Sequence, residues 1–233
     1  MIESNKLVYR LSGRYALFSD PLTRSGGEKS TLSVPTYQAL KGITESIYWK
    51  PTITWVVDRV RIAKPIRSET KSIRPIKFGG GNDLAYYRYL SDVEYHVEAH
   101  FEFNPHRPDL KKDWNEAKHN AMALRSLQKG GRRDVFLGAR ECQGYVEPMV
   151  FEDGKGPYDT TSAVEFGFQY HSISYPDETK DEGFYVNFWN VVMEFGLINF
   201  CRPEDCQVRR KIKQGTAKTF LPDINLSFDE GVL

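Results

Sequence analysis

Apolar and polar residues alternate most regularly between residues 93 and 103. Six apolar residues occupy the odd positions from Val93 to Phe103, and glutamate or histidine occupies the even positions between them. Because successive side chains of a strand point to opposite faces, this pattern gives one apolar and one polar face. It predicts a half-buried strand whose polar face is exposed.

Three further strands are predicted before residue 147. Residues 6–18 alternate and are rich in β-formers, residues 53–62 form the apolar run ITWVVDRVRI, and residues 135–137 form a short run. A basic segment with prolines follows the second of these strands and ends in the turn signal GGGN at residues 79–82.

Two helices are predicted between these strands. The first runs from Pro35 to about Trp49, with Ser33 as its N-cap and Pro51 beyond its end. The second starts at Asp109 as its cap and stops at the glycine pair at residues 130–131. Its expected apolar stripe consists of Leu110, Trp114, Ala117, Ala121 and Leu124.

The resulting order, βαββαβ, predicts an α+β protein with a ferredoxin-like (RRM-like) domain over residues 1–147. Residues 148–233 differ, because two aromatic-rich runs at 163–175 and 184–200 are separated by an acidic turn. They predict a small antiparallel β extension at the C-terminal end of the chain.

Composition limits the class of protein. The 233 residues are 40% hydrophobic and 27% charged, which excludes a disordered chain, and no apolar stretch approaches the ~20 residues of a membrane helix. The N-terminus has no apolar signal region, so we expect a cytoplasmic protein without a membrane partner. Cys201 and Cys206, taken as a pair, fit neither a zinc knuckle nor a disulfide framework, so we expect no bound metal.

Positive charge is concentrated in three windows. Residues 59–77, 107–133 and 202–218 carry net charges of +6, +5 and +4, so the remainder must carry −14 to reach the overall +1. This segregation favours a basic surface that binds a polyanion, and nucleic acid in particular. The alternative is that each run is only a solvated face.

The histidines of the regular strand do not predict a metal site. His96 and His100 are four residues apart on a strand, which separates them by ~13 Å. The sequence also lacks a P-loop, a dinucleotide fingerprint, a zinc protease motif and the aromatic signature of RRM domains.

The second predicted helix carries the candidate chemistry. Lys111, Lys118 and Arg125 are seven residues apart and should share one face, and His119 follows Lys118. In the predicted topology the end of the first helix, with Tyr48, can approach them. Tyrosine, lysine and histidine together can cleave RNA without metal by moving the 2′-OH proton and stabilising the phosphorane. The alternative is a surface Lys–His pair beside a core tyrosine.

Several segments resemble one known family. They are GITESIYWKPTITWVVDRV (42–60), KPI (64–66), SIR (72–74), EAHFEFN (98–104), KH (118–119) and FLGARE (136–141), and they occur in the expected order. They resemble the pre-crRNA-processing endoribonucleases of type I-C CRISPR systems, a subtype of the fifth Cas family within the RAMP superfamily.

The resemblance implies a fold, an activity and a set of site residues. The expected fold is a ferredoxin-like domain with a β extension, and the expected activity is metal-independent, cofactor-free cleavage of CRISPR repeat RNA at the base of its hairpin, leaving a 2′,3′-cyclic phosphate. Tyr48, Lys118 and His119 match the family's catalytic residues. The glycine-rich segment from Gly138, with Arg140, matches a loop that approaches RNA. Together with the basic windows, the expected RNA-binding residues are Lys111, Arg125, Lys129, Arg132, Arg133, Gly138 and Arg140.

The resemblance also implies partners. Family members stay on the 5′ handle of the crRNA as a subunit of the type I-C interference complex, beside its backbone and large subunits. A non-catalytic subunit that only binds the crRNA is the alternative function, and a metal-dependent DNA nuclease is a third.

Overall fold

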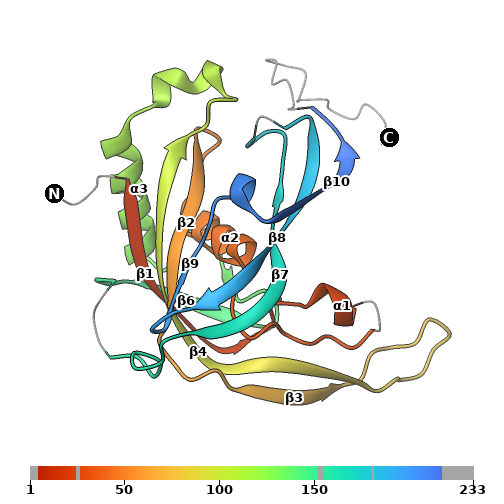
Figure 1. Cartoon of the computed structure of the whole chain (residues 1–233). Coiled ribbons are helices and arrows are strands. Elements are labelled where there is room, and N and C mark those ends of the chain that lie inside the picture. The colour runs from red at the N-terminus through yellow and green to blue at the C-terminus, as the bar shows by residue number, and fades with distance from the viewer. Residues whose placement is uncertain (1–4, 25–26, 152–154, 180, 217–233) are drawn as a thin grey trace, which may run out of the picture.

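The computed structural model describes residues 5–24, 27–151, 155–179 and 181–216. The strands of the described chain form two antiparallel sheets (Figure 1). The large sheet has the strand order β5-β6-β1-β4-β2-β9, with β3 paired to β4, and contains β1 (Lys6–Ala16), β2 (Ile53–Ile62), β3 (Ser68–Ile73), β4 (Ala85–Phe103), β5 (Val135–Phe136), β6 (Gln143–Pro148) and β9 (Leu197–Asn199). The small sheet has the order β10-β8-β7, with β7 (Val164–Ser174), β8 (Gly183–Met193) and β10 (Val208–Gln214).

The predicted α+β class is confirmed. The helical elements are α1 (Pro21–Arg24), α2 (Tyr37–Ile47), α3 (Glu116–Gln128) and two 3₁₀ turns, η1 (Pro108–Asp113) and η2 (Pro203–Asp205). No helix among the described residues is long and apolar enough to cross a bilayer. The predicted strand at 53–62 coincides with β2, and the strand at 163–175 matches β7 to within a residue at each end.

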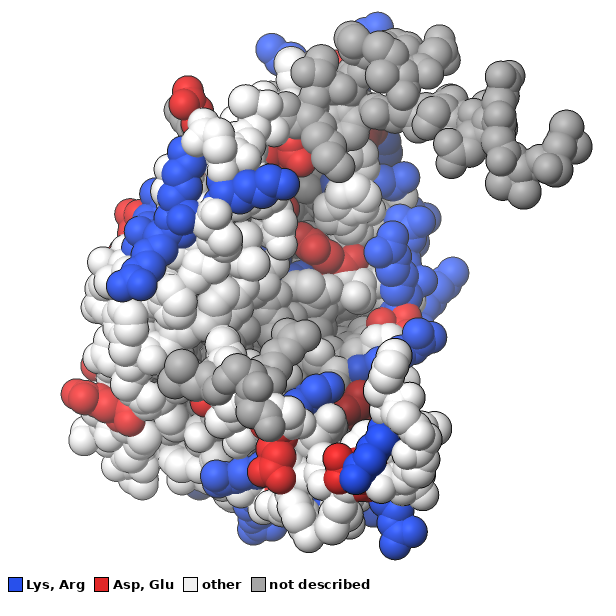
Figure 2. Space-filling model, turned by 90° about the vertical axis from the view of Figure 1, so that its right-hand side faces the viewer, with Lys and Arg blue, Asp and Glu red and all other residues white. Residues whose placement is uncertain are grey.

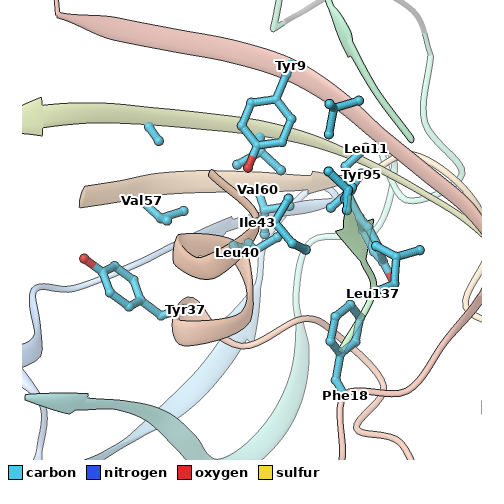
Figure 3. Packing of buried hydrophobic residues seen from close by; sticks show 14 of the residues in the cluster. Tyr9, Leu11, Phe18, Tyr37, Leu40, Ile43, Val57, Val60, Tyr95 and Leu137 are labelled. Atoms are coloured by element: carbon cyan, nitrogen blue, oxygen red, sulfur yellow. The ribbon is translucent and has the colours of Figure 1, made fainter. Parts of the chain in front are cut away.

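Helices α2 and α3 cover one face of the large sheet. Tyr9 of β1 shares a hydrogen bond of 2.8 Å with Thr44 of α2, and the ring of Phe101 on β4 contacts His119 of α3. Figure 3 shows Leu40 and Ile43 of α2 lying against side chains of this face. A bulge between Val57 and Arg59 in β2 lets both Val57 and Val60 face the core, although they are three residues apart.

The opposite side of α2 meets the small sheet. Tyr37 stacks on His171 of β7, with ring centroids 4.4 Å apart, and the backbone N–H of Ile173 donates to Gln38. In Figure 1, α2 accordingly lies between the two sheets. The extension also completes the large sheet, because β9 pairs with β2.

The start of each helix differs from its prediction. Thr36, rather than Ser33, caps α2, since its hydroxyl accepts a hydrogen bond from the N–H of Ala39. The second predicted helix is interrupted: residues 108–113 form η1, extended backbone follows, and Asn115 caps α3 by accepting from the N–H of Lys118.

This break shifts the buried face of the second helix, so the predicted apolar stripe is wrong. The buried residues of α3 are His119, Ala123 and Leu127. Ala117, Ala121 and Leu124 face solvent. Lys111 lies on η1, so it does not share a helical face with Lys118 and Arg125.

The basic segment after β2 also contains unpredicted structure. Residues 68–73 form β3, which pairs with the first part of β4 in a long hairpin that projects from the sheet (Figure 1). Its side chains are polar and mostly exposed, so they lack the apolar alternation that would have revealed it. Strand β6 was missed as well, since only two of its six residues are buried.

The polar face of β4 is covered rather than exposed. Glu98 is 9% exposed and forms ion pairs with Arg59, at 3.1 Å, and Lys6, at 3.7 Å. His100 Nδ1 lies 2.8 Å from Asp58 Oδ1 on the adjacent strand β2. The acidic and basic partners come from neighbouring strands, so the buried charges are neutralised in pairs.

The His100–Asp58 contact predicts a pH-dependent stability. The hydrogen bond to Asp58 raises the pKa of His100 above its ordinary value, although burial opposes it. A histidine with a raised pKa stabilises the folded state below the unfolded pKa of about 6.5, and this contribution is lost as pH rises through the folded pKa. We therefore expect the free energy of unfolding, measured with urea, to fall across this range. His100→Asn should reduce the fall, whereas the control His106→Gln should retain it; equal slopes in both variants would contradict the assignment.

Candidate active site

Tyr48 is positioned by the C-terminal end of α2. It is the helix C-cap: its N–H donates to the carbonyl of Thr44, and its own carbonyl accepts from Trp55 Nε1 at 2.6 Å. Extended backbone at this residue turns the chain from α2 toward β2, and the Tyr48 ring is fully buried. The side chain is thus fixed at the junction of the helix and the sheet.

His119, on the first turn of α3, is hydrogen-bonded to Tyr48. The Tyr48 hydroxyl lies 2.8 Å from His119 Nδ1, and His119 Nε2 lies 2.9 Å from the carbonyl oxygen of Asp113. A carbonyl only accepts, so Nε2 carries the proton and Nδ1 accepts from the tyrosine hydroxyl. Tyr48 and His119, which the sequence analysis paired, are therefore in contact although they lie 71 positions apart along the chain. Both side chains are fully buried.

Lys118 completes the predicted trio at the surface. Its side chain is 49% exposed, and its Nζ forms an ion pair with Asp113. The Asp113 carboxylate also accepts a hydrogen bond of 2.9 Å from Thr52 Oγ1 and lies 3.4 Å from His119 Nε2. Hydrogen bonds from Lys118 and Thr52 lower the pKa of Asp113, which keeps it ionised. Asp113 thus links Lys118 to His119.

Sequence reasoning missed Asp113 and Thr52. The predicted helix included Asp113, and in a continuous helix a residue five positions before Lys118 does not lie on the same face as Lys118. The 3₁₀ turn and the extended residues after it bring its carboxylate back over the start of α3. The only available signal was a threonine directly after Pro51, next to the predicted tyrosine.

The environment of Tyr48 keeps its hydroxyl protonated. Burial and the nearby Asp113 carboxylate raise the pKa of Tyr48, and Arg132 partly opposes them. The Arg132 guanidinium lies over the tyrosine ring, 6.0 Å from its centroid. Near neutral pH the group is therefore a hydrogen-bond donor, in agreement with its contact to His119 Nδ1.

A basic cleft adjoins this cluster. It has a volume of about 840 Å³, lies between the end of α3 and strands β5 and β6, and includes Lys129, Arg132 and Arg133 in its lining. The backbone N–H groups of Arg132 and Arg133 donate to the carbonyl of Ser46 near the end of α2. Arg132 therefore connects the cleft to Tyr48, and all three basic side chains are exposed.

The other predicted RNA-binding residues lie outside this cleft. Lys111 on η1 and Arg125 on α3 are exposed but do not line it. Gly138 has φ +89°, and a Cβ there would meet the carbonyl oxygen of Leu17 at 2.2 Å. This glycine is thus required for packing against the chain after β1, and Arg140 is exposed in the same loop.

The three basic windows do not merge into one surface. In Figure 1 the β3–β4 hairpin, α3 and β10 lie on different sides of the molecule. Figure 2 views the side that carries the small sheet and the hairpin tip, and there lysine and arginine side chains lie around a broad uncharged region, with acidic side chains among them. Lys218 lies outside the described residues. The basic windows are therefore spread over several sides of the molecule, because the sheet topology separates them.

A family model and two relatives of known sequence all match the same family, Cas5d. A family model for Cas5d, described as CRISPR-associated protein (Cas_Cas5), matches residues 6–201. A protein of Mannheimia succiniciproducens named CRISPR pre-crRNA endoribonuclease Cas5d is 26% identical over 224 residues, 84% of this chain and 95% of the relative. A protein of the same name from Thermus thermophilus is 32% identical over 162 residues, 65% of this chain and 66% of the relative.

A solved structure is also similar. It is described as the crystal structure of a CRISPR-associated protein, shares 37% sequence identity and superposes with a TM-score of 0.76. The match covers 88% of this chain and 96% of that one.

Proposed function

The chain belongs to the Cas5d family of CRISPR-associated proteins, and we propose that this endoribonuclease cuts the repeat of pre-crRNA, at the base of its hairpin, through Tyr48, Lys118 and His119. The observation that carries the proposal is the 2.8 Å contact between the Tyr48 hydroxyl and His119 Nδ1, with Lys118 linked to His119 through Asp113. Residues distant in the sequence form the predicted combination of groups at one place.

We also infer that residues 1–147 form a ferredoxin-like domain and residues 148–233 its β extension. The order β6-β1-β4-β2, with α2 after β1 and α3 after β4, supports this topology. The extension would share the large sheet through β9.

The chemistry requires a proton path from the ribose 2′-OH. In the proposed step the 2′-oxygen attacks phosphorus while its proton passes to the Tyr48 oxygen, and the proton of Tyr48 passes to His119 Nδ1. The direction of the existing hydrogen bond supports this relay, and the Asp113 carboxylate would stabilise the resulting imidazolium. The 5′-oxygen leaves and takes a proton from solvent, which leaves a 2′,3′-cyclic phosphate. No cofactor takes part.

Lys118 would stabilise the phosphorane. Its ammonium is held by Asp113 in the absence of RNA, and a phosphate would compete with this exposed ion pair. Release of Asp113 would then loosen the junction between η1 and α3, whose residues cover His119. Asp113 is therefore a positioning residue in this proposal, and RNA binding opens the buried pair.

One observation favours the second candidate, a subunit that binds crRNA without cutting it. Tyr48 and His119 are fully buried, and both ring nitrogens of His119 already have partners inside the protein. Such a subunit would use the Lys129–Arg133 cleft and the surrounding basic residues only for binding. In either case we propose that the protein remains on the crRNA 5′ handle with other subunits of a type I-C complex.

The first prediction concerns the chemistry of cleavage. Because the nucleophile is the 2′-OH, purified protein should cut its repeat RNA in EDTA and leave a 2′,3′-cyclic phosphate and a 5′-OH. A 2′-deoxy substitution at the nucleotide 5′ of the cut should abolish cleavage and leave binding intact. The products and affinities can be measured by gel analysis and filter binding. Cleavage of the deoxy RNA would exclude the proposed mechanism.

A second prediction separates Lys118 from its neighbours. In single-turnover assays with saturating enzyme, Lys118→Ala should cut about 10² or more times slower, because phosphorane stabilisation is lost. Lys112→Ala removes the same charge from the exposed turn before α3 and should cut at the wild-type rate. Both variants should bind deoxy RNA within about tenfold of wild type, or ~1.4 kcal/mol. A wild-type rate for Lys118→Ala would favour the crRNA-binding subunit.

A third prediction concerns the basic cleft. Replacing Lys129, Arg132 and Arg133 with glutamine should weaken RNA binding and lower the slope of log K against log salt by ~0.7 to 0.9 per lost phosphate contact. The matched control replaces Arg210, Lys211 and Lys213, which are exposed on β10, and should keep the wild-type slope. If both variants behave like wild type, the cleft does not bind the phosphate backbone.

A further inference from the structure

A histidine and two cysteines meet beside the N-terminal end of α2. His171 lies on β7, whereas Cys201 and Cys206 flank the turn η2 between β9 and β10. One ligand atom from each residue lies within 4.8 Å of the others, and the two sulfurs are 3.8 Å apart. In the described part of the chain, no other group of three such side chains is close enough to hold a metal ion.

The spacing of the sulfurs matches a tetrahedral metal. Zinc–sulfur bonds of about 2.3 Å at a tetrahedral angle separate two thiolate sulfurs by about 3.8 Å. The corresponding nitrogen–sulfur separation is about 3.5 Å, so the imidazole has to approach a sulfur by about 1.3 Å at most. The sequence-based expectation of no metal considered the cysteine pair alone; with His171 as a third neighbour, the four residues between the cysteines fall at the upper end of the spacing seen in zinc sites.

We propose that His171, Cys201 and Cys206 bind one Zn²⁺ ion, with water as the fourth ligand. His171 and Cys206 are buried, and Cys201 is half-buried, so the water position is on the Cys201 side. The ion would join β7 of the small sheet to the chain segment that leaves β9 of the large sheet. It would therefore connect the C-terminal extension to the rest of the fold.

The surroundings of His171 suit a zinc ligand. Its Nδ1 lies 2.8 Å from Ser172 Oγ, which also accepts a hydrogen bond from Asn187 Nδ2, and its Nε2 donates to the carbonyl of Cys201. When zinc binds, both thiols release their protons to solvent and the ring proton moves from Nε2 to Nδ1. Nε2 then binds the ion, while Nδ1 donates to Ser172 Oγ, the kind of outer hydrogen bond that orients metal-bound histidines.

The proposed zinc site is separate from the cleavage chemistry. Tyr37, which stacks on His171, is the first residue of α2, and Tyr48 is the cap at its other end. The eleven residues of this helix span about 16 Å. Zinc binding therefore does not depend on whether Tyr48, Lys118 and His119 cut RNA.

Zinc content provides the test. The full chain, purified under reducing conditions with its affinity tag removed, is given equimolar Zn²⁺, passed through gel filtration and analysed by mass spectrometry. We expect about one zinc per chain in wild type and less than a tenth of that in Cys201→Ser. Cys142→Ser, at a buried cysteine outside the cluster, is the matched control and should keep the metal. Co²⁺ in place of zinc should give thiolate-to-cobalt charge-transfer absorption that Cys201→Ser lacks.

Each other outcome overturns the proposal. Zinc at background level in reduced, folded wild-type protein would exclude the site. Equal zinc in wild type and Cys201→Ser would identify an adventitious ion. A Cys201–Cys206 disulfide together with no zinc binding after reduction would identify a redox pair instead. Circular dichroism of each variant checks that the chain is folded, and zinc should raise the melting temperature of wild type but not that of Cys201→Ser.

Discussion

The packing of α2 between the two sheets is the constraint on which the other features depend. Apolar residues from this helix face the large sheet, while Tyr37 and Gln38 contact the small one. A helix with neighbours on two sides can expose few polar groups, so Lys41 is buried as well and forms ion pairs with Glu178 and Glu45. The position of each end of α2 is therefore fixed by both sheets at once.

At the C-terminal end of α2, the two side chains proposed to move protons, Tyr48 and His119, are buried away from solvent. The Tyr48 hydroxyl and His119 Nδ1 are hydrogen-bonded to each other, and His119 Nε2 donates a hydrogen bond to the carbonyl of Asp113. Removing one partner would leave a buried polar group without a hydrogen bond, at a cost of about 1–3 kcal/mol. In the proposed mechanism, the same enclosure keeps both groups from RNA until the Asp113–Lys118 ion pair is released. The pair thus contributes to stability in the free protein and to chemistry in the proposed complex.

Charge is arranged locally rather than over the whole molecule. On the polar face of β4, Glu98 and His100 are paired with residues of β1 and β2, and Arg202 pairs with Glu102 at the end of β4. Within the part of the chain that the structure describes, only the cleft beside α3 combines several exposed basic residues with proximity to Tyr48. Affinity for a polyanion therefore depends on where the topology places each basic run, and the net charge of +1 has no bearing on it.

Sequence alone predicted the α+β class, the order of the main helices and strands without α1, β3 and β6, and the proposed combination of Tyr48, Lys118 and His119, because alternation, helical spacing and the IYWKP and KH segments are local signals. The sequence analysis did not locate the break between η1 and α3, where Trp114 stacks on Phe103 and Asn115 caps α3. That break turned the buried face toward His119 and brought Asp113 to the site. Likewise, the cysteine pair gained its third neighbour, His171, only through the folding of β7 against η2. Contacts between residues far apart in sequence are decided by sheet pairing and shared burial, which no local pattern contains.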